Sequence, residues 1–343
     1  MTKRFAAIVT ALAISAAAAL PATAKSGVEL LDPAVLKAAR AEGSVTVYGA
    51  QSQDLLQATA AAFEAAVPGI KVNILRAASG TLANRFMSEA EAGVFEADVL
   101  NSANVLIFTN RPAMWRPLTV ETIPTVAAWP SDQLHNIYLN SSQGPQLIAY
   151  NSNLIAKDKA PKTWEDLLDP KYKGKGMIVD PRASNTYLNW VNLMYETYGA
   201  TYVEKLRAQN FVPVEGGTQG VQQVAAGAYL VVIPPSFAHV QPLLDQGAPL
   251  GYVYPSENSS VPPLGPQHSW GLPAKSPHPN AGRVFMTWLL TPEAQRINCG
   301  GNSASVLLTD YEGCPSPVKG FISADQPIAA DRKAKLLALL GLQ

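Results

Sequence analysis

Cysteine is scarce in this chain, which has only two among its 343 residues. Cys299 and Cys314 lie close together near the C-terminus, and their spacing does not form a Cys-x-x-Cys redox motif. In an exported protein, such an isolated pair indicates a local disulfide rather than a metal or redox site. We therefore expect Cys299 and Cys314 to be bonded to each other.

The chain also lacks the short motifs that mark common catalytic and cofactor sites. No G-x-G-x-x-G follows its first predicted strand, and neither G-x-S-x-G nor H-E-x-x-H occurs. The four histidines are scattered through loops and proline-rich segments, with no pair at the i, i+4 spacing of a metal-binding helix. The sequence therefore predicts neither an enzyme nor a bound cofactor.

No excess of one charge is present either. The 26 basic residues balance 26 acidic ones, and no block of lysine or arginine stands out. Nucleic-acid-binding proteins concentrate positive charge on one face. The composition therefore gives no support for a nucleic-acid partner.

The first 24 residues have the composition of a secretory signal peptide. Lys3 and Arg4 precede an apolar stretch at 5–20, and Ala22-Thr23-Ala24 supplies small residues for cleavage. The alternative is a membrane anchor, but the alanine-rich stretch is shorter than the roughly 20 residues that a spanning helix needs. We expect export to the periplasm and removal of residues 1–24.

After this leader, strand-like and helix-like segments alternate, which predicts an α/β fold with mostly parallel sheets. Small polar residues follow each of the first three predicted strands. In open α/β sheets, ligands bind at the carboxyl ends of the strands. The candidates at these ends are Tyr48, Gln51, Ser52, Ser79, Gly80, Thr81 and Asn101.

Residues 176–187 read G-M-I-V-D-P-R-A-S-N-T-Y and predict a strand, a tight loop and a helix start. The apolar run suits a buried strand, Pro181 ends it, and Ser184, Asn185 and Thr186 are good helix N-cap residues. A helix N-terminus attracts anions, and Arg182 adds a full positive charge. The alternative is an ordinary connection in which Ser184 caps the helix and Arg182 is solvated.

Proline-rich stretches divide the chain into two predicted lobes. Residues 25–143 and 267–343 form the first lobe, and residues 144–266 form the second. In the second lobe, a strand at 229–233 ends in P-P-S-F-A-H, which makes Ser236 and Phe237 further candidates for the cleft.

Residues 161–175, P-K-T-W-E-D-L-L-D-P-K-Y-K-G-K, carry a family resemblance. Together with stretches at 43–48, 79–81, 97–99, 180–186 and 285–295, they make the chain resemble the periplasmic solute-binding proteins of bacterial ABC importers, in the ferric-iron-type branch. The resemblance implies two α/β lobes joined by two crossing segments, a ligand held between them, and delivery to an ABC permease in the inner membrane.

The sequence departs from the ferric members at one position that matters. Those members carry adjacent tyrosines after the strand that corresponds to 229–233, where this chain has Ser236 and Phe237. Fe(III) prefers phenolate or carboxylate oxygens, which phenylalanine does not supply. A metal site is therefore not predicted.

We expect a monomer that binds a small organic anion, a carboxylate or a phosphonate, between two facing helix N-termini. Residues 79–81 would hold it from one lobe and residues 184–186 from the other. The sequence leaves open whether Arg76, Arg182, His239 and Trp270 contact the ligand. Two alternatives remain. The first is a protein of the same fold that binds ferric iron or another metal complex, and the second is an exported enzyme.

Overall fold

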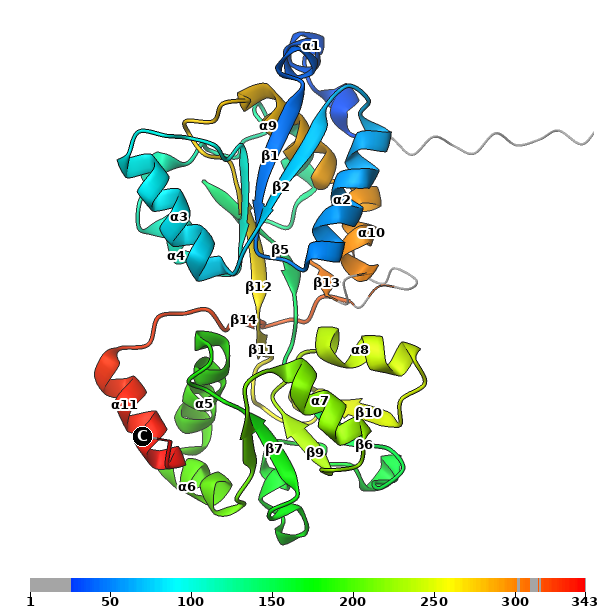
Figure 1. Cartoon of the computed structure of the whole chain (residues 1–343), viewed down its shortest axis with the longest axis vertical. Coiled ribbons are helices and arrows are strands. Elements are labelled where there is room, and N and C mark those ends of the chain that lie inside the picture. The colour runs from blue at the N-terminus through cyan, green and yellow to red at the C-terminus, as the bar shows by residue number, and fades with distance from the viewer. Residues whose placement is uncertain (1–25, 301–302, 309–313, 315, 343) are drawn as a thin grey trace, which may run out of the picture.

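The computed structural model describes residues 26–300, 303–308, 314 and 316–342, and the predicted signal peptide lies outside this range. Two separate sheets, one above the other in Figure 1, form two lobes that meet at a narrow waist. Helices pack around each sheet. The predicted two-lobed α/β architecture is confirmed, but the prediction of mostly parallel sheets is wrong, because the strands next to the crossing segments pair antiparallel and make both sheets mixed.

The sheet of the first lobe has the strand order β13-β5-β12-β3-β1-β2, with β4 paired to β5. β1 runs parallel to β2 and β3, whereas β12 runs antiparallel to β3 and β5. Its strands are β1 (Ser44–Gly49), β2 (Lys71–Arg76), β3 (Val99–Ser102), β4 (Leu134–His135), β5 (Tyr138–Gln143), β12 (Gln267–Gly271) and β13 (Ala304–Ser305). Its helices are α1 (Pro33–Glu42), α2 (Gln53–Ala66), α3 (Ser79–Glu91), α4 (Leu106–Thr109), α9 (Pro279–Leu289) and α10 (Pro292–Gly300).

The sheet of the second lobe has the order β10-β6-β9-β7-β8, with β7 parallel to β8 and β9. Its strands are β6 (Ile148–Asn151), β7 (Gly176–Val179), β8 (Val212–Val214), β9 (Val231–Ile233) and β10 (Leu250–Val253). The helices around it are α5 (Asn185–Tyr198), α6 (Ala200–Ala208), α7 (Gly217–Ala225), α8 (Phe237–Asp245) and α11 (Ala330–Leu340).

Both faces of each sheet are buried under side chains. Along β1, Val45 and Val47 join one apolar cluster and Tyr48 joins another, because successive strand residues point to opposite faces. Along β6, Ile148 and Ala149 divide in the same way. This double burial explains why β7 and β9 read as short, continuous apolar runs.

Two chain segments cross the waist, and they lie very close to each other. One leads from β5 to β6 through Gly144, and the other leads from β11 (Leu264–Gly265) to β12. A Cβ atom on Gly265 would lie 2.0 Å from the carbonyl oxygen of Gly144, so only glycine fits there.

A third segment also passes between the lobes, which the sequence does not predict. The disulfide between Cys299 and Cys314 is present as predicted, and it joins α10 to the start of this segment. Residues 316–329, which we call the C-terminal strap, then include β14 (Ile322–Ser323), paired with β11. At its lobe-1 end, the Val318 N–H donates to Gln143 Oε1 at 2.8 Å.

The strap leads to α11, which packs on α5 and α6 of the second lobe, as Figure 1 shows. Leu336 is fully buried in that lobe's core. The sequence assigned residues 267–343 to the first lobe, and the structure corrects this for the end of the chain. The amphipathic pattern reveals an apolar helix face, but it carries no information about which lobe covers that face.

Candidate functional site

A cavity of about 980 Å³ lies between the two lobes. The first lobe lines it with the loop after β1, the start of α2, the end of β2 and parts of β12 and α10. The second lobe contributes the starts of α5 and α8. The polar and charged lining residues are Gln51, Ser52, Asp54, Arg76, Ser184, Thr186, Tyr187, Ser236, His239, His268 and Ser303.

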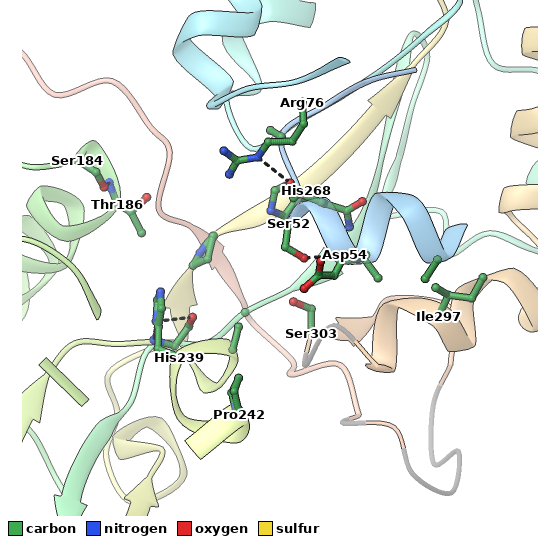
Figure 2. A pocket seen from close by; sticks show the side chains of 18 of the residues that line it. Ser52, Asp54, Arg76, Ser184, Thr186, His239, Pro242, His268, Ile297 and Ser303 are labelled. Carbon is green, nitrogen blue, oxygen red and sulfur yellow. Dashed lines mark hydrogen bonds between the residues drawn. The ribbon is translucent and has the colours of Figure 1, made fainter. Parts of the chain in front are cut away.

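Among the lining residues that the structure describes, the first-lobe wall has one cationic side chain, that of Arg76 at the end of β2. Its Nε donates to the carbonyl oxygen of Gln51 at 3.3 Å, which holds the guanidinium beside the loop after β1. Among the described residues, no carboxylate lies within ion-pair distance of Arg76. Figure 2 shows this side chain across the cavity from Ser184 and Thr186. The Arg76 guanidinium can therefore bind an anion without first breaking an ion pair.

Three helices point their N-termini at the cavity, and each has serine at the N-cap. Ser52 Oγ accepts from the N–H of Leu55 at 3.4 Å in α2, and Ser184 Oγ accepts from the N–H of Thr186 at 3.1 Å in α5. Ser236 caps α8 through a reciprocal capping box with His239. Each helix therefore presents the positive end of its dipole to the same space.

The second-lobe wall also holds a neutral histidine whose protonation site is set by hydrogen bonding. His239 Nδ1 accepts from the backbone N–H of Ser236 at 3.0 Å. A nitrogen that accepts carries no proton, so the proton of the neutral ring is on Nε2. Burial lowers the pKa of His239, which keeps the ring neutral at pH 7.

His268 on β12 lines the cavity from the first lobe, and its Nδ1 is buried without a hydrogen-bond partner among the described residues. Burial lowers the pKa of His268 to about 4. Tyr187 on α5 is also desolvated, and burial raises the pKa of its phenol. Both rings are therefore neutral at physiological pH.

Several residues predicted for the ligand site do line this cavity. They are Gln51, Ser52, Ser184, Thr186 and Ser236. Arg76 and His239, which the sequence left undecided, line it as well. All seven lie at or after the carboxyl ends of strands, as the edge rule for α/β sheets predicts.

The triplet at 79–81 lies elsewhere. Ser79 Oγ accepts from the N–H of Ala103 at 3.0 Å, and Gly80 and Thr81 are exposed outside the cavity. The neighbouring Tyr48 is fully buried under α3, with its hydroxyl hydrogen-bonded to Glu89 at 2.9 Å. This hydroxyl therefore stabilises the fold of the first lobe.

The predicted residue Asn101 and Trp270, which the sequence left undecided, are both part of the interior of the first lobe. Asn101 is fully buried, and its Nδ2 donates to the carbonyl oxygen of Ser269 at 3.4 Å on the adjacent strand. Trp270 belongs to the apolar core, with its Nε1 donating to Ser141 Oγ at 3.0 Å. Neither side chain lines the cavity.

Three predicted residues of the second lobe also lie outside the cavity lining. Arg182 forms a two-pronged ion pair with Asp180, with its Nη2 2.7 Å from Oδ2, and remains about half exposed. Asn185 is exposed at the first position of α5. Phe237 packs against Tyr252, with ring centroids 4.9 Å apart.

Four polar lining residues were not predicted: Asp54, Tyr187, His268 and Ser303. Asp54 and Tyr187 are each within two residues of a predicted candidate, so a wider window around each strand end would have included them. His268 and Ser303 reach the cavity through the return of the chain to the first lobe, which no local pattern encodes.

Among the described residues, no three histidine, cysteine, aspartate or glutamate side chains come together in a way that could hold a metal ion. The same part of the chain contains no helix with the length and apolar character needed to cross a membrane.

Comparison with known proteins identifies the family of this chain. A family model described as bacterial extracellular solute-binding protein matches residues 49–296. The chain is 22% identical over 272 residues to an Fe(3+)-binding periplasmic protein of Serratia marcescens, and the match covers 76% of this chain and 78% of that protein.

Solved structures of similar proteins share the fold. Iron-bound HitA from Pseudomonas aeruginosa superposes with a TM-score of 0.65 at 20% identity, covering 87% of this chain and 98% of that chain. AfuA from Actinobacillus pleuropneumoniae, with fructose-6-phosphate bound, gives a TM-score of 0.64 at 18% identity and covers 88% and 99%. With the family match spanning most of its length, this chain belongs to the bacterial extracellular solute-binding proteins, a family of binding proteins rather than enzymes.

Proposed function

We propose that this protein is the solute-binding component of an ABC importer and that it captures a small organic anion between its lobes. The observation that carries this proposal is the convergence of three serine-capped helix N-termini and Arg76 on one cavity. Carboxylates and phosphonates are the expected anions. Delivery of the bound solute to an inner-membrane permease follows from the family.

The hydrogen bonds of the capping serines support this assignment. A hydroxyl has one hydrogen and two lone pairs. Ser52 and Ser184 each use a lone pair to accept a helix N–H, so each hydroxyl keeps its hydrogen for donation. The proton on His239 Nε2 is a further donor in the same wall. Several neutral donors and one guanidinium form the kind of set that binds an oxyanion.

Ligand binding should also close the lobes. Donors on both walls contact one ligand better when the walls approach, so the bound state favours closure. Small-angle scattering of the monomer should show a smaller radius of gyration at saturating ligand. An unchanged radius would count against this clamp.

A thermal-shift screen tests the proposal directly. We expect at least one carboxylate, phosphonate or sugar phosphate to raise the melting temperature, because a ligand that binds only the folded state stabilises it by mass action. Arg76→Ala should abolish that shift at the same ligand concentration, whereas Arg182→Ala should retain it. A screen in which only cations such as polyamines give shifts would overturn the proposal.

A second candidate is ferric iron, favoured by the likeness to iron-bound HitA and to the Serratia protein. The cavity offers Asp54 and Tyr187 as oxygen ligands. Ser236 and Phe237 occupy the strand exit where the ferric members are expected to have tyrosines. Titration with ferric iron, with and without citrate, distinguishes the candidates, because an iron–phenolate bond would produce a visible absorption band that a simple anion does not.

A further inference from the structure

The C-terminal strap contacts the wall of the cavity at one side chain. Thr186, in the first turn of α5, lines the cavity, and its Oγ1 lies 3.0 Å from Oδ1 of Asp325 in the strap. The strap is held there by its backbone, since the N–H of Ala324 donates to the carbonyl oxygen of Gly265 at 2.8 Å. Asn189 of α5 adds a hydrogen bond to the carbonyl oxygen of Gln326 at 2.8 Å.

The direction of the Thr186 hydrogen bond follows from the chemistry of the carboxylate. The Thr186 hydroxyl donates to Oδ1 of Asp325, and burial raises the pKa of this carboxyl only to about 6, so that the acceptor-only carboxylate is the main form at pH 7. The single hydrogen of the Thr186 hydroxyl is therefore directed at Asp325. Toward the cavity, this hydroxyl can offer only a lone pair.

Thr186 thus differs from the serine two residues before it. Ser184 accepts from a backbone N–H and keeps its hydrogen for the ligand, whereas Thr186 donates to Asp325 and can only accept from the ligand. Both residues line the cavity, on the side opposite Arg76 in Figure 2.

The charge of Asp325 strengthens this difference. Its second oxygen, Oδ2, is buried without a hydrogen-bond partner among the described residues, and none of their cations lies within ion-pair distance of it. An anion beside Thr186 would have an uncompensated negative charge one hydroxyl group away. Asp54 also lines the cavity and adds a second acceptor that an anion avoids.

We infer that the ligand carries, besides its anionic group, a hydrogen-bond donor that Thr186 receives, either a hydroxyl or an ammonium group. In this assignment Thr186 determines specificity and Asp325 is the positioning residue behind it. The inference rests on the proposed function, since it describes the second end of the same anion.

Matched sets of ligands test it by calorimetry on the exported, disulfide-bonded protein. Each set has one anion with and without the donor: hydroxypropionate and β-alanine against propionate, hydroxyethylphosphonate and aminoethylphosphonate against ethylphosphonate, and a hexose phosphate against cyclohexyl phosphate. In the set that binds, wild-type protein should prefer a donor-bearing member by about tenfold, the value of one hydrogen bond of this kind. Whether the hydroxyl or the amine member is preferred identifies the donor.

Thr186→Val keeps the shape of the side chain and removes the acceptor. It should reduce the preference to within about twofold, and Thr186→Ser should restore the preference. Asp325→Leu releases the hydrogen of Thr186 and should also reduce the preference. Ser184→Ala is the matched control, because it should weaken the donor-bearing and donor-free members alike.

The outcomes separate this inference from the proposed function. If anions bind and wild-type protein shows no preference for the donor, this inference is wrong and the proposed function stands. If Thr186→Val removes the preference and Asp325→Leu retains it, the role of Asp325 is wrong. If no member of any set binds, the proposed anion function itself fails.

Discussion

The N-termini of α3 and α5 look alike in the sequence and have different surroundings in the structure. Each begins with a triplet of small polar residues after a strand, and each has an arginine close before it. At α5, Ser184 caps the helix and lines the cavity. At α3, the N-cap is Ala78, and Ser79 Oγ accepts from the backbone of Ala103 instead.

The two arginines differ in the opposite sense from the two helix starts. Arg76, before α3, lines the cavity without a carboxylate partner among the described residues, whereas Arg182, before α5, is paired with Asp180. At these two helix starts, the first lobe therefore contributes the charge and the second lobe contributes the capped helix terminus. A local pattern specifies where a helix begins, but the neighbouring chain decides whether its polar groups remain available to a ligand.

The largest expected effect concerns the two arginines. Arg76→Ala should weaken binding of the anion found by screening by about tenfold to a hundredfold, because it removes a charge-assisted hydrogen bond. Arg182→Ala should change the affinity by less than about twofold, since its ion pair lies outside the cavity. Calorimetric titration of both variants measures the contrast, and equal losses would show that both arginines reach the ligand.

The next largest effect is a pH dependence of the protein's stability that arises at Asp325, the partner of Thr186 in α5. Burial raises the pKa of Asp325 to about 6, well above its ordinary value of about 3.9. The folded state therefore binds this proton more tightly, so the contribution of Asp325 to stability is present near pH 4 and is lost as pH rises through 6.

Asp325→Asn removes this titration. The free energy of unfolding of the variant minus that of wild type should therefore increase by about 2 kcal/mol from pH 4 to pH 8. Denaturant unfolding of both proteins at each pH gives the difference, from which the contributions of other groups, such as His268, cancel. A stability difference that is the same at both pH values would contradict the raised pKa.

The two serines provide a smaller and more local contrast. Ser184→Ala should weaken anion binding by about tenfold through loss of one donor, whereas Ser79→Ala should leave binding unchanged. Ser79→Ala should instead cost about 1 kcal/mol of stability, because the N–H of Ala103 loses its acceptor. Binding by calorimetry and stability by denaturant unfolding separate the two roles.

The smallest effect is expected at Thr81, which is exposed on α3. Thr81→Ala should change affinity by less than about twofold, because its hydroxyl does not line the cavity. A tenfold loss would mean that the α3 terminus reaches the ligand when the lobes close, and the two helix starts would then be equivalent.

Much of the architecture could be predicted from the sequence because it depends on local patterns. Apolar runs at 176–179 and 229–233 mark buried strands, and an isolated cysteine pair marks the disulfide. The cavity was predicted in part, since the edge rule points to Ser52, Ser184 and Ser236 without knowledge of the packing.

The remaining features depend on contacts between distant segments. Nothing near Asp325 in the sequence indicates that it lies behind Thr186, because that contact requires the strap to cross the waist. Distant contacts also remove Tyr48 from the predicted site, since its burial depends on α3 and on Glu89. Such residues become visible only when the tertiary arrangement is known.

The placement of α11 has a consequence for measurement. The first α-helix, α1, belongs to one lobe and the last, α11, packs on the other, so the two ends of the described chain lie on different lobes (Figure 1). The lobe closure that we propose would change the distance between them. Fluorophores attached at α1 and α11 would therefore turn the protein into an optical sensor, in which energy transfer reports occupancy without any probe near the binding site.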